Sequence, residues 1–177
     1  MINIRIILFF FIATLGVFLL LRIQGRLETK ETPLGIVSLE LAGTTTEVKN
    51  ILQTWETEAM IGTAKNNILL DFLFIPLYSL LFYTLCGSIS VRTRRIVAKM
   101  GVVLAFGAVI AGLFDVFENI LMLLSLEDHY NDLTVLLTAF FAITKFILLG
   151  LALLYVIPFG IVVIVRKLMY GDDYARS

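Results

Sequence analysis

Four long apolar segments dominate this chain and decide what it can fold into. Each is close to or longer than the roughly 20 apolar residues that an α-helix needs to cross the hydrocarbon core of a bilayer. They predict helices at about 6–22, 67–88, 97–126 and 133–166. The whole chain is 59% hydrophobic and 16% charged, whereas soluble domains are about half apolar and about a quarter charged. We therefore expect an all-α, four-helix transmembrane bundle that forms a single integral membrane domain over residues 1–177.

The first apolar segment has the look of a secretion signal, because it is short and Arg5 precedes it. No small-x-small cleavage site follows it, since residues 22–26 read Arg-Ile-Gln-Gly-Arg. We therefore expect a retained first helix.

The distribution of lysine and arginine predicts the orientation, because cytoplasmic connections of membrane proteins carry an excess of these residues. The connection between the second and third helices is basic and has no acid, whereas the next connection is acidic. The residues concerned are Arg92, Arg94, Arg95 and Lys99 in the first, and Glu127, Asp128 and Asp132 in the second. We expect both termini in the cytoplasm and residues 23–65 outside, in a bacterial inner membrane.

The outer segment 23–65 carries its own structural signals. Ile36–Leu41 is an apolar patch interrupted by Glu40, and a threonine N-cap with Glu47 in the first turn then starts a helix. Apolar residues recur at helical spacing as far as Trp55. This predicts an extracytoplasmic amphipathic helix between helices 1 and 2. It would lie on the outer leaflet with Trp55 at headgroup level, or cover the charged layer as a lid, and both can hold at once.

Four ionisable residues lie inside the predicted membrane helices: Asp71, Asp115, Glu118 and Lys145. At ~1.5 Å per residue, each is about 30 Å or less from the basic cluster at the opposite end of its own helix, so the four converge at one depth. Ionisable groups at such a depth are costly and mark a functional site or a pairing network. They predict a polar cluster at the outer leaflet.

The third predicted helix presents one face of small residues that continues into the polar cluster. Steps of four and three residues place these positions on that face: Gly101, Ala105, Ala108, Gly112, Asp115 and Asn119. Small residues let another membrane helix approach closely. We therefore expect Asp115, with Glu118 alongside, to point into the bundle.

The neighbouring helices offer polar partners at similar spacing. The candidate ligand-binding residues are Asn67, Asp71, Tyr78, Asp115, Glu118, Asn119, Thr138 and Lys145. Three buried acids face one base, or two if Arg22 joins them. Either an acid is protonated, or a cation or cationic ligand completes the balance. A structural network, a ligand or catalytic site, and an ion or proton path all stay open at this point.

Several classes of chemistry are excluded by what the chain lacks. Cys86 and His129 are its only cysteine and histidine, so we expect no metal and no cofactor. The formal net charge of +0 gives no basis for binding nucleic acid. No Glu-x-x-His pair, His-Glu-x-x-His motif or Gly-x-Ser-x-Gly elbow is present.

Two resemblances extend these expectations. The segments Gly35–Gly43, Leu70–Phe74 and Gly112–Asn119, with Lys145-Phe146, resemble an uncharacterised family of small bacterial four-helix integral membrane proteins, which implies no activity. The layout is a short first helix, a long outer loop, an acidic second helix with a nearby proline and a cytosolic C-terminus. It is similar to the EXPERA fold of sterol isomerases and sigma-2-type receptors. That resemblance implies an acid-lined intramembrane pocket for hydrophobic amines or sterols, and no catalytic residue carries over.

The leading hypothesis is a non-enzymatic partner or lipid- or amphiphile-binding subunit. We expect membrane lipids as partners, with a hydrophobic or amphiphilic small molecule and a larger membrane complex as further candidates. The alternative is a membrane-embedded enzyme, an EXPERA-like isomerase or similar, that uses its carboxylates on a hydrophobic substrate. Asp115 or Glu118 would then be the general acid and Asp71 a charge stabiliser.

Overall fold

The computed structural model describes residues 4–170 and all their side chains except that of Tyr170. The regular elements in this range are all helices: α1 (Ile4–Ile23), α2 (Ile36–Glu40), α3 (Thr45–Thr57), α4 (Ile61–Ser90), α5 (Arg95–Leu126) and α6 (Asp132–Tyr170). Four of them, α1, α4, α5 and α6, are long and apolar enough to cross a membrane. The protein is thus an all-helical membrane protein by the length and composition of its helices.

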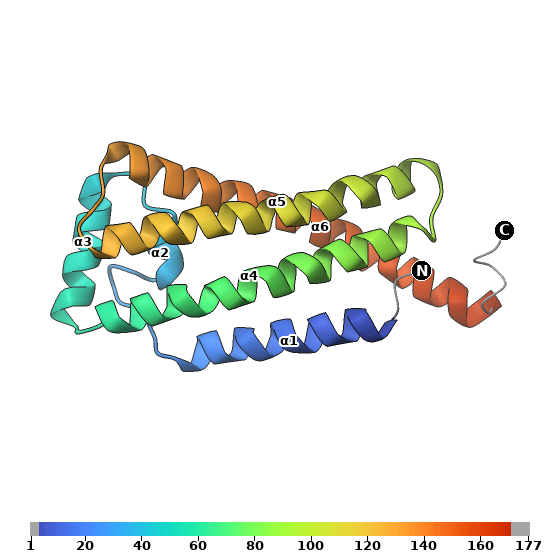
Figure 1. Cartoon of the computed structure of the whole chain (residues 1–177), viewed down its shortest axis with the longest axis horizontal. Coiled ribbons are helices and arrows are strands. Elements are labelled where there is room, and N and C mark those ends of the chain that lie inside the picture. Colours follow the sequence, from blue (N-terminus) through green and yellow to red (C-terminus); the bar gives the residue numbers. More distant parts are fainter. Residues whose placement is uncertain (1–3, 171–177) are drawn as a thin grey trace.

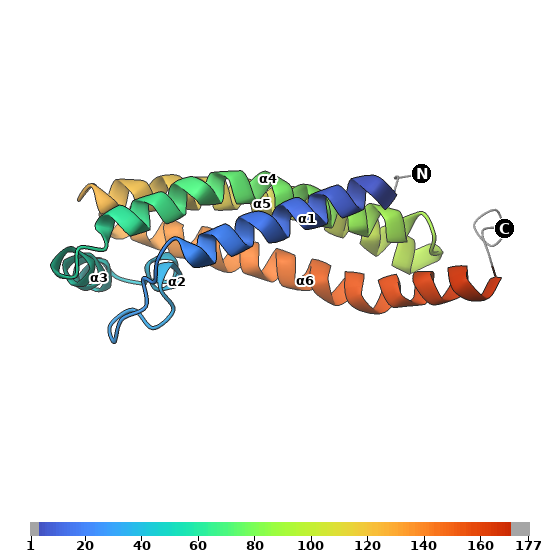
Figure 2. The ribbon, with the colours of Figure 1, turned by 90° about the horizontal axis from the view of Figure 1, so that it is seen from below.

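The four long helices run side by side along the long axis of the molecule, each antiparallel to the next in the chain (Figure 1). α4 packs against both α5 and α1, and α6 packs against α5 and α4. Seen from below, α6 follows one side of the layer that the other long helices form (Figure 2). α1 has 20 residues, about the 30 Å of a hydrocarbon core at 1.5 Å per residue. The other three are longer and extend past that thickness.

Helix α4 begins earlier than hydropathy predicts. It starts at Ile61, whereas the apolar pattern places its start at about residue 67 and assigns residues 61–65 to the outer segment. Once a helix is nucleated, each added residue costs little, so the helix continues through polar positions. Ala64 and Ile68 also pack in the apolar cluster at this end of the bundle, which rewards the extra turns.

Helix α3 crosses the end of the bundle at which α1 ends and α4 begins (Figure 1). Thr44 is its N-cap and accepts a hydrogen bond from the Glu47 amide at 3.2 Å, as predicted. Its apolar side chains pack in one cluster with Met122 of α5 and Val135 of α6. The expectation for Trp55 is wrong in this structure. Its side chain is 0% exposed instead of free to lie among lipid headgroups, because its indole N–H donates to the Leu27 carbonyl inside that cluster.

A second apolar cluster lies at the opposite end of the bundle. It contains Cys86 and Ile89 of α4, Ala105 of α5, and Ala152 and Tyr155 of α6. The four ionisable residues singled out in the sequence fall between the two clusters along their helices: Asp71 of α4, Asp115 and Glu118 of α5, and Lys145 of α6. The bundle therefore holds a polar layer enclosed between two apolar layers.

Candidate functional site

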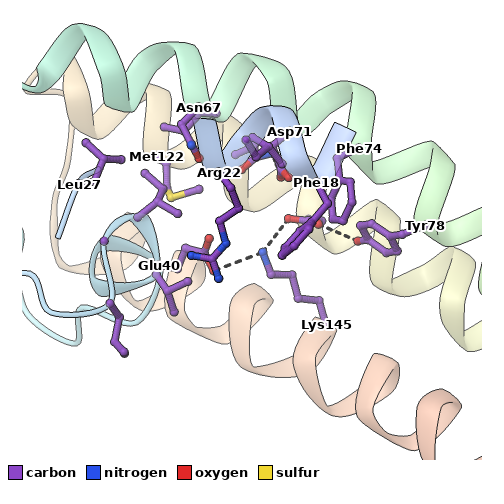
Figure 3. A pocket seen from close by; sticks show the side chains of 18 of the residues that line it. Phe18, Arg22, Leu27, Glu40, Asn67, Asp71, Phe74, Tyr78, Met122 and Lys145 are labelled. Carbon is purple, nitrogen blue, oxygen red and sulfur yellow. Dashed lines mark hydrogen bonds and ion pairs between the residues drawn. The ribbon is translucent and has the colours of Figure 1, made fainter. Parts of the chain in front are cut away.

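The polar layer is centred on Lys145 of α6. Its ammonium donates to Asp115 Oδ1 at 2.7 Å and to Glu118 Oε1 at 2.8 Å, and it lies 3.4 Å from Glu40 Oε2. Lys145 is 5% exposed, Asp115 4% and Glu118 0%. The predicted meeting of Lys145 with Asp115 and Glu118 is confirmed, and Glu40 joins them, so that one buried ammonium pairs with three carboxyl groups. Figure 3 shows Lys145 and Glu40 facing each other at the pocket.

Helix α4 contributes two further polar side chains to this layer. The Tyr78 hydroxyl donates to Asp115 Oδ2 at 2.7 Å, so both carboxylate oxygens of Asp115 have a partner. The Asn119 amide donates to Asp71 Oδ2 at 2.7 Å. Asp71 and Asn119 thus form a link between α4 and α5 beside the lysine cluster.

Close approach of α4 and α5 makes these contacts possible. A Cβ added at Gly112 would collide with the Ser79 hydroxyl oxygen and lie 3.4 Å from Ile75 Cγ2. Small residues let the backbones of two membrane helices approach this closely. The predicted small-residue face therefore packs on α4 at Gly112, and Asp115 and Asn119 continue it into the polar layer.

Glu40 is the site residue that the sequence pattern missed. It is the last residue of α2, it lies outside the membrane helices, and it is 7% exposed. Burial raises the pKa of Glu40 above its ordinary value of 4.5, and the positive charge of Lys145 offsets this only in part. The usable signal was a single acid inside the apolar patch Ile36–Leu41, since a carboxylate is seldom surrounded by apolar residues unless it is paired.

Two carboxyl oxygens of the layer lack a hydrogen-bond donor. Glu40 Oε2 and Glu118 Oε2 are both buried and accept no hydrogen bond from the described residues, although the Lys145 ammonium lies 3.4 Å from Glu40 Oε2. Leaving a buried acceptor unsatisfied costs about 1–3 kcal/mol. Glu40 lines the pocket described next, so a donor from a bound ligand would satisfy Glu40 Oε2.

A pocket of about 930 Å³ adjoins this layer. Its polar lining consists of Asn67, Asp71, Asp115 and Lys145 from the long helices and Glu40 from α2. The other surfaces are mainly apolar and come from α1, α4 and α6, including these residues: Phe18, Leu21, Ile68, Phe74, Phe82, Phe146 and Leu149. Figure 3 shows side chains from α1, α4 and α6 facing one another across this space. The pocket has the form of a site for a molecule with a polar head and an apolar body.

The structure brings most of the predicted site residues to the pocket, but not all of them. Those that line it are Asn67, Asp71, Tyr78, Asp115, Asn119 and Lys145. Glu118 is fully buried behind Lys145 and does not line it. Thr138 also lies away from it, because its hydroxyl donates to the Thr134 carbonyl one turn earlier in the same helix.

The base expected to join the cluster, Arg22, lies at the rim instead. Its side chain is 68% exposed, and its nearest acid is Glu28 at 4.0 Å. Arg22 and Arg26 both line the pocket, and Arg26 is exposed. The pocket therefore has carboxylates inside and guanidinium groups at its edge.

Within residues 4–170, no group of three or more histidine, cysteine, aspartate or glutamate side chains is arranged to hold a metal ion. No protein-family model, no curated protein and no solved structure matches this chain. What the site does has to be argued from its own geometry.

Proposed function

We propose that this protein binds a membrane-dissolved amphiphile, with the polar head of the ligand in the carboxylate-lined pocket and its apolar part between α1 and α6. The observation that carries the proposal is the 930 Å³ pocket, in which buried carboxylates face aromatic and aliphatic side chains. Four buried or half-buried acids, Glu40, Asp71, Asp115 and Glu118, stand against Lys145 alone in this layer. A ligand head that is positively charged or rich in N–H donors would complete the balance.

The proposed location of the pocket is the outer leaflet. The basic connection Arg92–Lys99 and the start of α1 would lie in the cytoplasm, following the positive-inside rule. α2 and α3 would then lie on the extracytoplasmic side and cover the outer end of the bundle. A ligand could reach the pocket directly from the outer leaflet, because α1 and α6 both contribute residues to its walls.

Binding takes precedence over catalysis for a geometric reason. Both oxygens of Asp115 already accept hydrogen bonds, one from Lys145 and one from Tyr78, so Asp115 is poorly placed to hand a proton to a substrate. Glu118 does not line the pocket. Of the three candidate catalytic acids, Asp71 alone combines a place in the lining with a single protein partner among the described contacts.

Asp71→Asn tests the proposal. The replacement is nearly isosteric and can still accept the hydrogen bond from Asn119, but an amide cannot neutralise a cationic head. We expect wild-type protein, purified in mild detergent, to carry a bound amphiphile in native mass spectrometry, and Asp71→Asn to lose it with little change in thermal melting.

Glu127→Gln is the matched control, because Glu127 is an exposed acid that pairs with Lys65 at 3.2 Å outside the pocket. It should keep the ligand. Wild-type protein that is bare after purification, and that stays bare after incubation with a lipid extract, would contradict the proposed function.

A further inference from the structure

We infer that the pocket selects a zwitterionic lipid head of the phosphoethanolamine type, with its primary ammonium at Asp71 and Glu40 and its phosphate at Arg22 and Arg26. The inference rests on the proposed function and names the class of ligand. Two observations support the inference. The carboxylates and the guanidinium groups occupy different parts of one pocket, and members of both sets lie at a similar depth in the bundle.

The inner acids share one cation, Lys145, and the described ion pairs of Lys145 do not include Asp71. Lys145 is closer to Asp115 and Glu118, at 2.7 and 2.8 Å, than to Glu40, at 3.4 Å. Glu40 lines the pocket, and its Oε2 atom is buried without a hydrogen-bond donor. The described polar partner of Asp71 is the neutral amide of Asn119. A ligand ammonium has three N–H donors, enough for both acids.

The rim carries a net positive charge, because Arg22 and Arg26 line the pocket there together with one exposed acid, Glu28. Among the described residues Arg22 has one ion pair, an exposed contact with Glu28 at 4.0 Å. Its guanidinium also lies over the Phe18 ring, 5.4 Å from the ring centre. Arg26 makes no ion pair within residues 4–170. Guanidinium groups bind phosphate through two parallel N–H donors, which makes a pair of arginines at a lipid-facing rim a natural phosphate site.

One member of each charge set, Arg22 and Asp71, lies at the same depth. Antiparallel α1 and α4 meet at Phe18 and Phe74, whose ring centres are 6.4 Å apart. Arg22 lies one turn further out along α1, and Asp71 lies just under one turn further out along α4, so both are about 5 Å beyond the ring pair. A phosphoethanolamine head, whose two charges are two carbons apart, would span them while lying in the plane of the membrane.

The apolar lining continues inward from this level. Phe82 is two turns deeper than Phe74 on α4, about 12 Å at 1.5 Å per residue, and it lines the same pocket together with Leu149. The glycerol and the first part of the acyl chains would lie there. A trimethylammonium head would balance the negative charge of the carboxylates. It could not form hydrogen bonds with them, because it has no N–H to donate to Glu40 or Asp71.

The test compares five probes on delipidated protein in detergent, with bound fractions read by native mass spectrometry and by thermal shift. Three are phospholipids with the same two oleoyl chains: phosphatidylethanolamine, phosphatidylcholine and phosphatidylglycerol. The fourth is a long-chain primary amine, and the fifth is water-soluble glycerophosphoethanolamine. We expect phosphatidylethanolamine to bind at least about tenfold more tightly than each of the others, since each loses one charge-assisted contact or the buried tail.

The variants separate the two halves of the head. Arg22→Gln/Arg26→Gln should weaken phosphatidylethanolamine about tenfold and leave the amine unchanged, because exposed pairs contribute modestly one by one but add when both face one phosphate. Lys30→Gln, an exposed base of the same loop that does not line the pocket, should change neither. Asp71→Asn should weaken both ligands.

Each contrary result has a distinct meaning. Equal binding of the amine and phosphatidylethanolamine, with no effect of the double arginine variant, overturns the zwitterionic head and leaves the proposed function standing. Equal binding of phosphatidylglycerol or phosphatidylcholine overturns the primary ammonium. Equal binding of glycerophosphoethanolamine overturns a lipid as the source of the head. Failure of all five probes counts against the proposed function itself.

Discussion

Among the described residues, Lys145 is the base that lies buried in the polar layer, and its ammonium contacts carboxyl groups from two other helices. Two of these carboxyls, Asp115 and Glu118, belong to α5, and the third, Glu40, belongs to α2. Removing one partner of a buried ionic group leaves uncompensated charge, which costs more than the pair itself contributes. The lysine therefore has a structural role in addition to its place in the pocket lining.

Lys145→Met should lower the stability of the protein by about 3–5 kcal/mol, because three buried carboxyl groups lose their common cation. Thermal unfolding in detergent measures the effect. Lys65→Met is the control: Lys65 also pairs with an acid at 3.2 Å, but the pair is exposed and should be worth at most about 1 kcal/mol. The double variant Lys145→Met/Glu118→Gln should recover part of the loss. Equal melting temperatures for the two lysine variants would contradict the role assigned to Lys145.

Sequence reasoning found the charged residues of the site because charge is out of place in an apolar helix, and it found the neutral Asn67, Tyr78 and Asn119 through their helical spacing. Asp71, Asp115 and Lys145 stand out by their charge, and their meeting follows from their common depth. Glu40 does not stand out, because it lies in the outer segment between two membrane helices, where acids are ordinary. Its burial depends on how α2 folds back onto the bundle. Thr138 was misleading since a threonine hydroxyl can satisfy its own helix backbone.

At the scale of helices, the contact between α4 and α5 sets the position of the acids. At Gly112 an added Cβ would meet the Ser79 hydroxyl and lie 3.2 Å from Ser79 Cβ. Both atoms belong to a short side chain that has little room to move aside. The helix spacing at this point therefore depends on the missing side chain of one glycine.

Gly112→Ala should destabilise the protein by about 1–3 kcal/mol through overpacking, in spite of the better helix propensity of alanine. Gly107→Ala is a matched control on the same helix, because the nearest atom to its added Cβ is Leu148 Cδ2 at 3.7 Å, an ordinary contact. It should be neutral or slightly stabilising. Ser79→Ala should restore part of the stability of Gly112→Ala in a thermal melt. A Gly112→Ala protein as stable as Gly107→Ala would mean that the helices are further apart than described.

The long helices could be predicted as elements because hydropathy over about 20 residues is a strong signal. Their ends could not, since α4 gains its first turns from packing by Ala64 and Ile68 that the sequence does not reveal. The sequence predicts which residues form the apolar face of α3. It does not predict that this face packs against Met122 of α5 and Val135 of α6. Trp55 has the amphipathic character of a headgroup anchor, and in the folded chain its indole finds a carbonyl partner instead.

For the whole molecule, the proposed orientation can be measured directly. In a Cys86→Ser background, a cysteine placed at Gly43 should react with a membrane-impermeant thiol reagent added to intact cells, and one placed at Thr93 should not. The reason is that Thr93 lies in the basic connection between α4 and α5, whereas Gly43 lies between α2 and α3 at the other end of the bundle. Labelling after permeabilisation controls for access. The reverse pattern would place the pocket in the inner leaflet.

The membrane class and the antiparallel order of the helices were predictable from the chain alone, because long apolar segments that cross a bilayer as helices satisfy their backbone hydrogen bonds internally. The pocket was not. Its volume depends on α1 packing against α4 while α6 packs against α5 and α4, and on α2 returning to place Glu40 over the lysine. Such long-range choices leave no local pattern in the sequence.

The thin attachment of α1 has a kinetic consequence. Among the described residues of α1, Val17 alone is buried, although Thr14, Phe18 and Leu21 of this helix form part of the pocket wall. We expect α1 to separate from the bundle by breaking its contact with α4, while α4, α5 and α6 stay packed, because such local openings need far less free energy than complete unfolding. The residence time of a ligand would then depend on the strength of the contact between α1 and α4. Substitutions in the contact between α1 and α4 should change the rate of lipid exchange without changing the melting temperature of the bundle.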